Sequence, residues 1–191
     1  MKRVLAAAVL TVLLASCSSS SSPAGVSAPA PHVTSPAGPV ASATGHGPAV
    51  YELAGGGTAT VSKNGRVVVR DGAGTTVSVS SCARPYSYAR AVGLLAAFRE
   101  AVGANDANRV ASLLLYPLRY DARGRSTLVH SRHELLAQYT SLFSAHVRRV
   151  IAMPDPHALF CNDQGFMVGD GAVWGNRTTD GHYGVVTLNI S

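Results

Sequence analysis

The chain has 191 residues, with 16 lysines and arginines against 10 aspartates and glutamates, for a formal net charge of +6. The basic residues are scattered along the chain, which argues against nucleic acid as a partner. Residues 50–191 are long enough to bury a single hydrophobic core without a metal or a partner.

Residues 1–16 have the pattern of an export signal. Lys2 and Arg3 form a short positive segment, and an apolar run follows from Val4 to Ala15. This run suits the core of a signal peptide and is too short to cross a bilayer as a helix.

The apolar run ends in Leu14-Ala15-Ser16-Cys17, which resembles the lipobox of bacterial lipoproteins. The resemblance implies that the Cys17 thiol is alkylated with diacylglycerol and becomes the first residue of the mature protein, with the lipid bilayer as its partner. An address in the cell envelope follows. Ser18, where aspartate would suggest retention at the inner membrane, favours the outer membrane, on its periplasmic or its surface side. The alternative is an ordinary signal with a chance cysteine.

Residues 17–49 are expected to form a disordered tether. Six prolines stand among alanine, serine, glycine and threonine, and the segment has no charged residue apart from two histidines. Such a composition cannot bury enough apolar surface to fold. The tether would hold the folded part of the chain away from the membrane.

Two cysteines, Cys82 and Cys161, remain when Cys17 is set aside. The export signal implies an oxidising compartment, so we predict a disulfide between them. Two free buried thiols are the alternative. A catalytic thiol is disfavoured because neither cysteine stands in a CxxC or a Cys/His signature.

Residues 50–82 are predicted to form a three-strand β-meander. Thr58–Lys63 and Arg66–Arg70 flank Asn64-Gly65, a hairpin signal in which both turn positions need positive φ. The third strand spans Thr75–Ser81. A sheet of this size is not stable alone, so it should pack on the segment that follows, with Cys82 joining the two.

Residues 83–191 alternate between helical and strand patterns. A helix is expected from Ser87 to Val102, ended by Gly103 as a left-handed cap, and a shorter one begins at Asn105 or Asp106. Ser131, with Glu134 three residues later, predicts a capping box. Further elements are a helix over 145–153 and strands over 118–121, 127–130, 158–162, 166–169, 172–174 and 183–190.

Residues 92–190 resemble the nuclear transport factor 2-like superfamily. The resemblance rests on the helix Val92–Val102, on Asn105-Asp106, on Tyr116-Pro117-Leu118 and on the segment Asp163–Trp174. It implies an α+β fold in which helices pack on a curved antiparallel sheet, the cystatin and nuclear transport factor 2-like cone, here preceded by the meander. Members include dehydratases, isomerases and binding modules, so the fold does not decide the function.

The cone would contain a pocket, and its candidate lining residues are aromatic or titratable: Tyr120, His130, Tyr139, Phe143, Asp170 and Trp174. Plain core is the alternative for the aromatic ones. Trp174 ranks first as a ligand contact, because the only tryptophan of the chain stands on a short strand between Gly171 and Gly175.

General acid or base chemistry would need Asp121, His130, Asp163 or Asp170 inside such a pocket. Asp163 and Asp170 stand next to or near glycine, in contexts typical of turns. His130-x-x-His133 is a weak metal signal, because His130 precedes the Ser131 cap and no third ligand is near in sequence. We therefore predict no metal and no cofactor.

The leading hypothesis is a lipid-anchored envelope protein that binds a small molecule, a peptide or an envelope protein without catalysis. A dehydratase or isomerase of the same fold is the second hypothesis. The third is an inhibitor of a cell-wall hydrolase, although removal of Lys2 and Arg3 with the signal leaves a net charge of +4, which basic hydrolases would repel.

Overall fold

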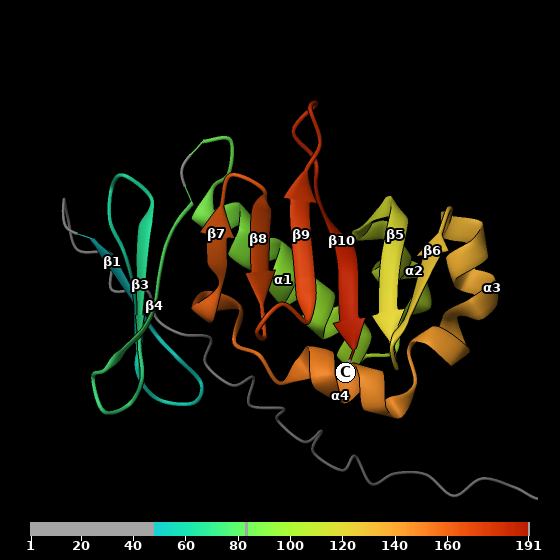
Figure 1. Ribbon diagram of the computed structural model, residues 1–191, viewed down its shortest axis with the longest axis horizontal. Coiled ribbons are helices and arrows are strands. Elements are labelled where there is room, and N and C mark those ends of the chain that lie inside the picture. The colour runs from blue at the N-terminus through green and yellow to red at the C-terminus, as the bar shows by residue number, and fades with distance from the viewer. Residues whose placement is uncertain (1–47, 83, 191) are drawn as a thin grey trace, which may run out of the picture. The chain divides into compact units, whose positions relative to one another are not determined.

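A computed structural model describes residues 48–82 and 84–190 and shows an α+β protein with four α-helices and two sheets in that part of the chain (Figure 1). The expected signal 1–16, the lipidation site Cys17 and the tether up to residue 47 lie outside the described residues. All described residues belong to one compact unit. None of the helices in that unit is long and apolar enough to cross a bilayer.

The first sheet is an antiparallel meander with the strand order β1-β2-β3-β4. Its strands are β1 (Ala49–Glu52), β2 (Thr58–Val61), β3 (Arg66–Arg70) and β4 (Thr76–Ser81). The prediction of three strands was therefore one too few. β1 has four residues directly after the proline-rich segment, too short for its alternation to stand out, and it is held by its pairing with β2.

The turn between β2 and β3 also differs from the prediction. Only Gly65 has a positive φ, +83°, and the Ser62 N–H donates to the Arg66 carbonyl at 2.8 Å. The Gly65 N–H donates in turn to the Ser62 carbonyl at 2.9 Å. The loop therefore has three residues and ends in a glycine bulge, instead of a two-residue turn with two left-handed residues.

The second sheet has six strands in the order β6-β5-β10-β9-β8-β7. β10 pairs parallel with β5, and every other pair in this sheet is antiparallel. The strands are β5 (Leu114–Ala122), β6 (Arg125–Val129), β7 (Phe160–Asn162), β8 (Gly165–Val168), β9 (Val173–Arg177) and β10 (Tyr183–Ile190). The last strand of the chain thus lies in the middle of the sheet.

Side-chain caps define where most of the helices begin. Asp106, Ser131 and Ser144 each accept a hydrogen bond from the N–H three residues later, which satisfies a donor of the first turn. The helices are α1 (Tyr88–Gly103), α2 (Ala107–Ser112), α3 (Arg132–Leu142), α4 (Ala145–Ala152) and the 3₁₀ turn η1 (Pro156–Ala158).

The end of α1 corrects one expectation. Gly103 lies inside the helix, and the left-handed residue is Asn105, with φ +55°. Asparagine tolerates this conformation better than most residues with a Cβ. Its Oδ1 also accepts a hydrogen bond from Arg148 Nη1 at 2.9 Å, so α4 holds the turn in place.

In Figure 1, α1 and α2 lie behind the six-stranded sheet, α3 lies beside the edge strand β6, and α4 lies near the end of β10. One side of α1, which includes Leu95 and Phe98, is buried. Phe98, Phe143, Leu118 and Leu188 are almost completely buried between helices and sheet. Core side chains therefore pack between α1 and the sheet.

A disulfide joins the two sheets. Cys82, directly after β4, is bonded to Cys161 on β7, with Cα atoms 5.0 Å apart and 79 residues between them in sequence. Both cysteines are buried. The pairing is the one that the cysteine count predicts, and it fixes the end of the meander against the edge of the second sheet.

Candidate functional site

Three residues of the predicted pocket lie together in the core. The rings of Tyr139 and Phe143 stack with centroids 4.8 Å apart and planes 14° apart. Tyr120, on β5, donates its hydroxyl hydrogen bond to the Leu142 carbonyl at 2.9 Å. Burial raises the pKa of the Tyr120 and Tyr139 hydroxyls. These contacts stabilise the packing of α3 on the sheet and leave the rings little access to solvent.

A hollow of about 270 Å³ opens beside Tyr120, where the ends of β5 and β10 meet the α3–α4 connection. Ser141, Ser144 and His146 line it. The side chain of Ser144 already caps α4 through the Val147 N–H. Tyr139 and Phe143 are not among its lining residues, so Tyr120 alone of these three core aromatic residues borders the hollow.

The other predicted pocket residues lie elsewhere. His130 is exposed before α3, and its N–H donates to Glu134 Oε2 at 2.8 Å. Asp170 is exposed in the turn between β8 and β9, with φ +51°. Trp174 lies on β9 and projects from the face opposite the helices, as its pairing with Thr187 and Met167 shows. The six residues therefore do not line one pocket.

The acid–base candidates are also dispersed. Asp163 is exposed in the β7–β8 turn, and Asp121 lies on β5 next to Arg119. His133 is exposed in the first turn of α3. In residues 48–82 and 84–190, no group of three or more histidine, cysteine, aspartate or glutamate side chains is placed to hold a metal ion.

The sheet face away from the helices, here called the open face, has one row of side chains that crosses all six strands. Cross-strand pairing connects each member of this row to the next. Three members are apolar or aromatic at the β7–β9 end, and the row runs Phe160, Met167, Trp174, Thr187, Arg119 and Leu128. Aligned side chains on a pleated sheet form a continuous surface.

Two adjoining hollows begin on the open face, and the larger one reaches round the end of the sheet to Ala122 and Ile190, which pack on the core. One, of about 300 Å³, is lined by Trp174, Gln164 and Thr187, and the other, of about 550 Å³, extends to the β5–β6 turn. Both hollows are lined by Arg119, Asp121 and Asn189. We call the two hollows together the sheet groove.

An ion pair stands at the centre of the sheet groove. Arg119 Nε lies 2.7 Å from Asp121 Oδ2. Asp121 Oδ1 is buried and has no hydrogen-bond partner among the described residues. A buried carboxylate oxygen normally has a partner, so this atom departs from the usual pattern.

Trp174 is held at one end of the groove by a glycine turn. Gly171 has φ +88°, and a Cβ at that position would lie 3.1 Å from the indole Nε1. The Asn189 amide donates to the Gly171 carbonyl at 2.7 Å, which ties the turn to β10. The Gly171 turn therefore packs against the indole, which stays partly exposed.

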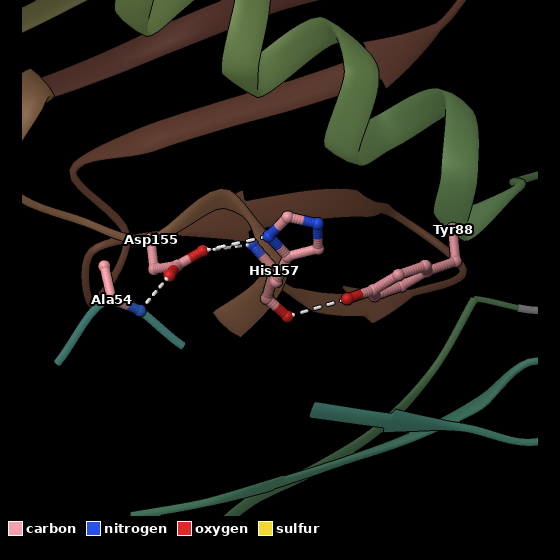
Figure 2. A network of polar contacts seen from close by, with 4 residues as sticks. All are labelled: Ala54, Tyr88, Asp155 and His157. Carbon is pink, nitrogen blue, oxygen red and sulfur yellow. Dashed lines mark hydrogen bonds and ion pairs between the residues drawn. The ribbon is translucent and has the colours of Figure 1, made fainter. Parts of the chain in front are cut away.

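A second polar cluster connects the two sheets (Figure 2). Asp155 Oδ2 accepts the Ala54 N–H at 2.7 Å, and Asp155 Oδ1 accepts the His157 N–H at 2.9 Å. The His157 ring Nδ1 lies 3.2 Å from the same Oδ1, and the Tyr88 hydroxyl donates to the His157 carbonyl at 2.9 Å. Tyr51 stacks on the His157 ring at 4.9 Å.

Electrostatics in this cluster follow from burial and hydrogen bonding. Burial alone would raise the pKa of the Asp155 carboxyl, but the two backbone N–H donors and the His157 ring outweigh it and lower the pKa. Burial raises the pKa of the Tyr88 hydroxyl. Both Asp155 oxygens are engaged within the protein, so we interpret the cluster as a junction between the two sheets.

Sequence reasoning missed Arg119, Asn189 and Gln164 as groove residues. The signal for Arg119 was present: it alternates with Leu118 and Tyr120, which are buried on the helix side. Asn189 becomes a neighbour of Asp121 only through the parallel pairing of β10 with β5. That pairing depends on the whole fold and is not visible locally.

Comparison with protein-family models, with curated proteins and with solved structures gives no match to this chain.

Proposed function

We propose that this protein is a non-catalytic binding module whose ligand occupies the sheet groove. The observation that carries the proposal is the groove itself, which Trp174 closes at one end and which the Arg119–Asp121 ion pair lines. Ligand sites combine an apolar or aromatic surface with a few placed polar groups, and this groove has that composition. A ring could lie on the indole while a hydroxyl or amide donates to Asp121.

Binding is favoured over dehydratase or isomerase chemistry because the acid–base candidates do not converge. Asp121 is paired with Arg119, whereas His130 and Asp170 are exposed at other places. On the helix side of the sheet, where a cone pocket would hold the reacting groups, Phe143 is core, and the hollow beside Tyr120 is lined by His146 and by no carboxylate. We keep the nuclear transport factor 2-like cone as a proposal, supported by helices packed on one face of a mostly antiparallel sheet.

We also propose that the module works in the cell envelope, anchored to lipid through Cys17. The N-terminal pattern supports this address. The disulfide between Cys82 and Cys161 is in keeping with it, because disulfides persist in oxidising compartments. Replacing Cys17 with serine should release the protein from the membrane fraction of the cells that make it, and retention of the variant there would contradict the anchor.

The binding proposal is tested with the emission of Trp174, the only tryptophan of the chain. The full chain carrying Cys17→Ser would be titrated with a defined panel: glucose and N-acetylglucosamine oligomers, their acidic derivatives, and short peptides. At least one probe should shift the emission saturably. Asp121→Ala should weaken that binding about tenfold, the loss expected for one hydrogen bond to a charged group.

The matched control is Glu52→Ala, which removes an exposed carboxylate from the first sheet. It should leave the affinity unchanged. A panel in which no probe shifts the emission at millimolar concentration would overturn the proposal, as would equal losses for the two variants. The other candidate occupant of the open face is a second copy of the chain. Sedimentation of the free protein at several concentrations would detect this self-association.

A further inference from the structure

We infer that the end of the sheet groove at the β5–β6 turn is an anion site, which takes the carboxylate or phosphate group of a small ligand. The inference rests on the proposed function, since the ring of the same ligand would lie on Trp174. Arg119, Arg123 and Arg125 line the larger hollow, against the single carboxylate of Asp121. The lining therefore has an excess of two positive charges.

The charges in this hollow are not balanced by the protein residues around them. Arg119 is paired with Asp121. The side chains of Arg123 and Arg125 make no hydrogen bond or ion pair with any other residue that the structure describes, and both residues are exposed. Guanidinium groups bind carboxylate and phosphate through paired N–H donors, so an anion in the hollow would find two free partners.

The backbone of the turn supports the same inference. Ala122 pairs with Arg125, which leaves Arg123 and Gly124 as a two-residue turn with φ +52° and +71°. Asparagine or glycine is the usual residue at the first of these positions, because positive φ is costly for other side chains. Arginine has no conformational advantage at this position.

The preferred ligand is therefore a small sugar acid or sugar phosphate, whose ring contacts Trp174 and whose anionic group contacts the arginines. The phosphate of a lipid headgroup has the same chemistry as the phosphate of a soluble sugar phosphate. Soluble probes and vesicles separate these two sources. The probes are inorganic phosphate, glucose, glucose 6-phosphate, and vesicles of phosphatidylglycerol compared with phosphatidylcholine.

The experiment uses the full chain with Cys17→Ser and follows the arginine Nε–H signals by NMR and the emission of Trp174. Inorganic phosphate at tens of millimolar should shift the signals of Arg123 and Arg125. Glucose 6-phosphate should bind about tenfold more tightly than glucose, with a difference that falls as salt is added. If only phosphatidylglycerol vesicles bind, the soluble ligand is wrong and the inference fails.

Arg123→Asn combined with Arg125→Gln should remove the preference for glucose 6-phosphate. The matched control is Arg66→Gln combined with Arg70→Gln, which removes the same charge from exposed positions of β3. Arg123→Asn alone should weaken phosphate binding without lowering the stability, since asparagine suits the turn. A stability loss with unchanged phosphate binding would show that Arg123 serves the turn alone and would overturn the inference.

The outcomes also separate this inference from the proposed function. Equal affinity for glucose and glucose 6-phosphate, with a Trp174 response to both, leaves the groove as a binding site and removes the anion site. Phosphate shifts at Arg123 and Arg125 with no Trp174 response to any probe leave an anion site and remove the proposed function. No shift with phosphate overturns the anion site directly.

Discussion

The Ala54 N–H donates a 2.7 Å hydrogen bond to Oδ2 of Asp155, a residue 101 positions later in the chain. Ala54 belongs to the β1–β2 connection and Asp155 caps η1, so one carboxylate holds the meander against the second sheet. Its side chain is only 16% exposed, so solvent screens these hydrogen bonds weakly.

Asp155→Asn should therefore lower the free energy of unfolding by about 1–3 kcal/mol, because the amide cannot accept all the hydrogen bonds that the carboxylate accepts. The folded-state pKa lies below the ordinary 3.8, so this contribution is fully present above about pH 4 and is lost as the pH falls through the folded value. Urea unfolding between pH 2 and 7 measures both effects. Asp163→Asn, at an exposed position, is the control, and equal losses for both variants would contradict the role of Asp155.

Removing the disulfide should cost on the order of 4 kcal/mol, since it closes a long loop in the unfolded chain. The double variant Cys82→Ser with Cys161→Ser should unfold at lower denaturant concentration than the parent, and reductant should have no further effect on it. The parent should be sensitive to reductant. An unchanged midpoint in the double variant would show that the other contacts between the sheets suffice.

Two buried tyrosines should respond in opposite ways to loss of their hydroxyls. The Tyr139 hydroxyl is buried without a hydrogen-bond partner among the described residues, so Tyr139→Phe should raise the stability by about 1 kcal/mol while the stack on Phe143 is kept. Tyr120→Phe removes the bond to the Leu142 carbonyl and should lower the stability by about 1 kcal/mol. Thermal unfolding of both variants and the parent in the same buffer measures these two changes in stability. A loss of stability in Tyr139→Phe would show that its hydroxyl has a partner in solution.

Replacing Gly171 and Gly93 with alanine should change the stability in opposite directions. Gly171→Ala introduces a Cβ at φ +88° and 3.1 Å from the Trp174 indole, so it should cost about 1–2 kcal/mol and shift the tryptophan emission. Gly93 lies in α1, is exposed, and has nothing within 4 Å of an added Cβ. Gly93→Ala should stabilise the protein by up to about 1 kcal/mol without changing the emission. Emission that is unchanged in Gly171→Ala would contradict the support of the indole by this turn.

Local signals in the sequence predicted much of the fold. Ser131 marks the start of α3, and Tyr183–Ile190 is a strand with the predicted bounds. Trp174 was singled out from composition and from its flanking glycines, and the proposed site contains it. These features depend on residues close together in the chain, where capping and alternation act.

The parts that could not be predicted depend on distant partners. Asp121 and Asn189 are neighbours only because β5 and β10 pair in parallel, and Ala54 reaches Asp155 only when the two sheets pack. Tyr120, Tyr139 and Phe143 were proposed for a pocket because aromatic rings suit ligands as well as cores. Their burial and stacking show that they are core residues.

The position of β10 sets an order of events during synthesis. Residues 183–190 form the last strand that the structure describes, yet they lie between β5 and β9, so the six-stranded sheet cannot close until this segment has left the ribosome. Before that moment the two halves of the sheet each have an unpaired edge. A sheet with this strand order therefore forms late, from segments that lie far apart in the chain.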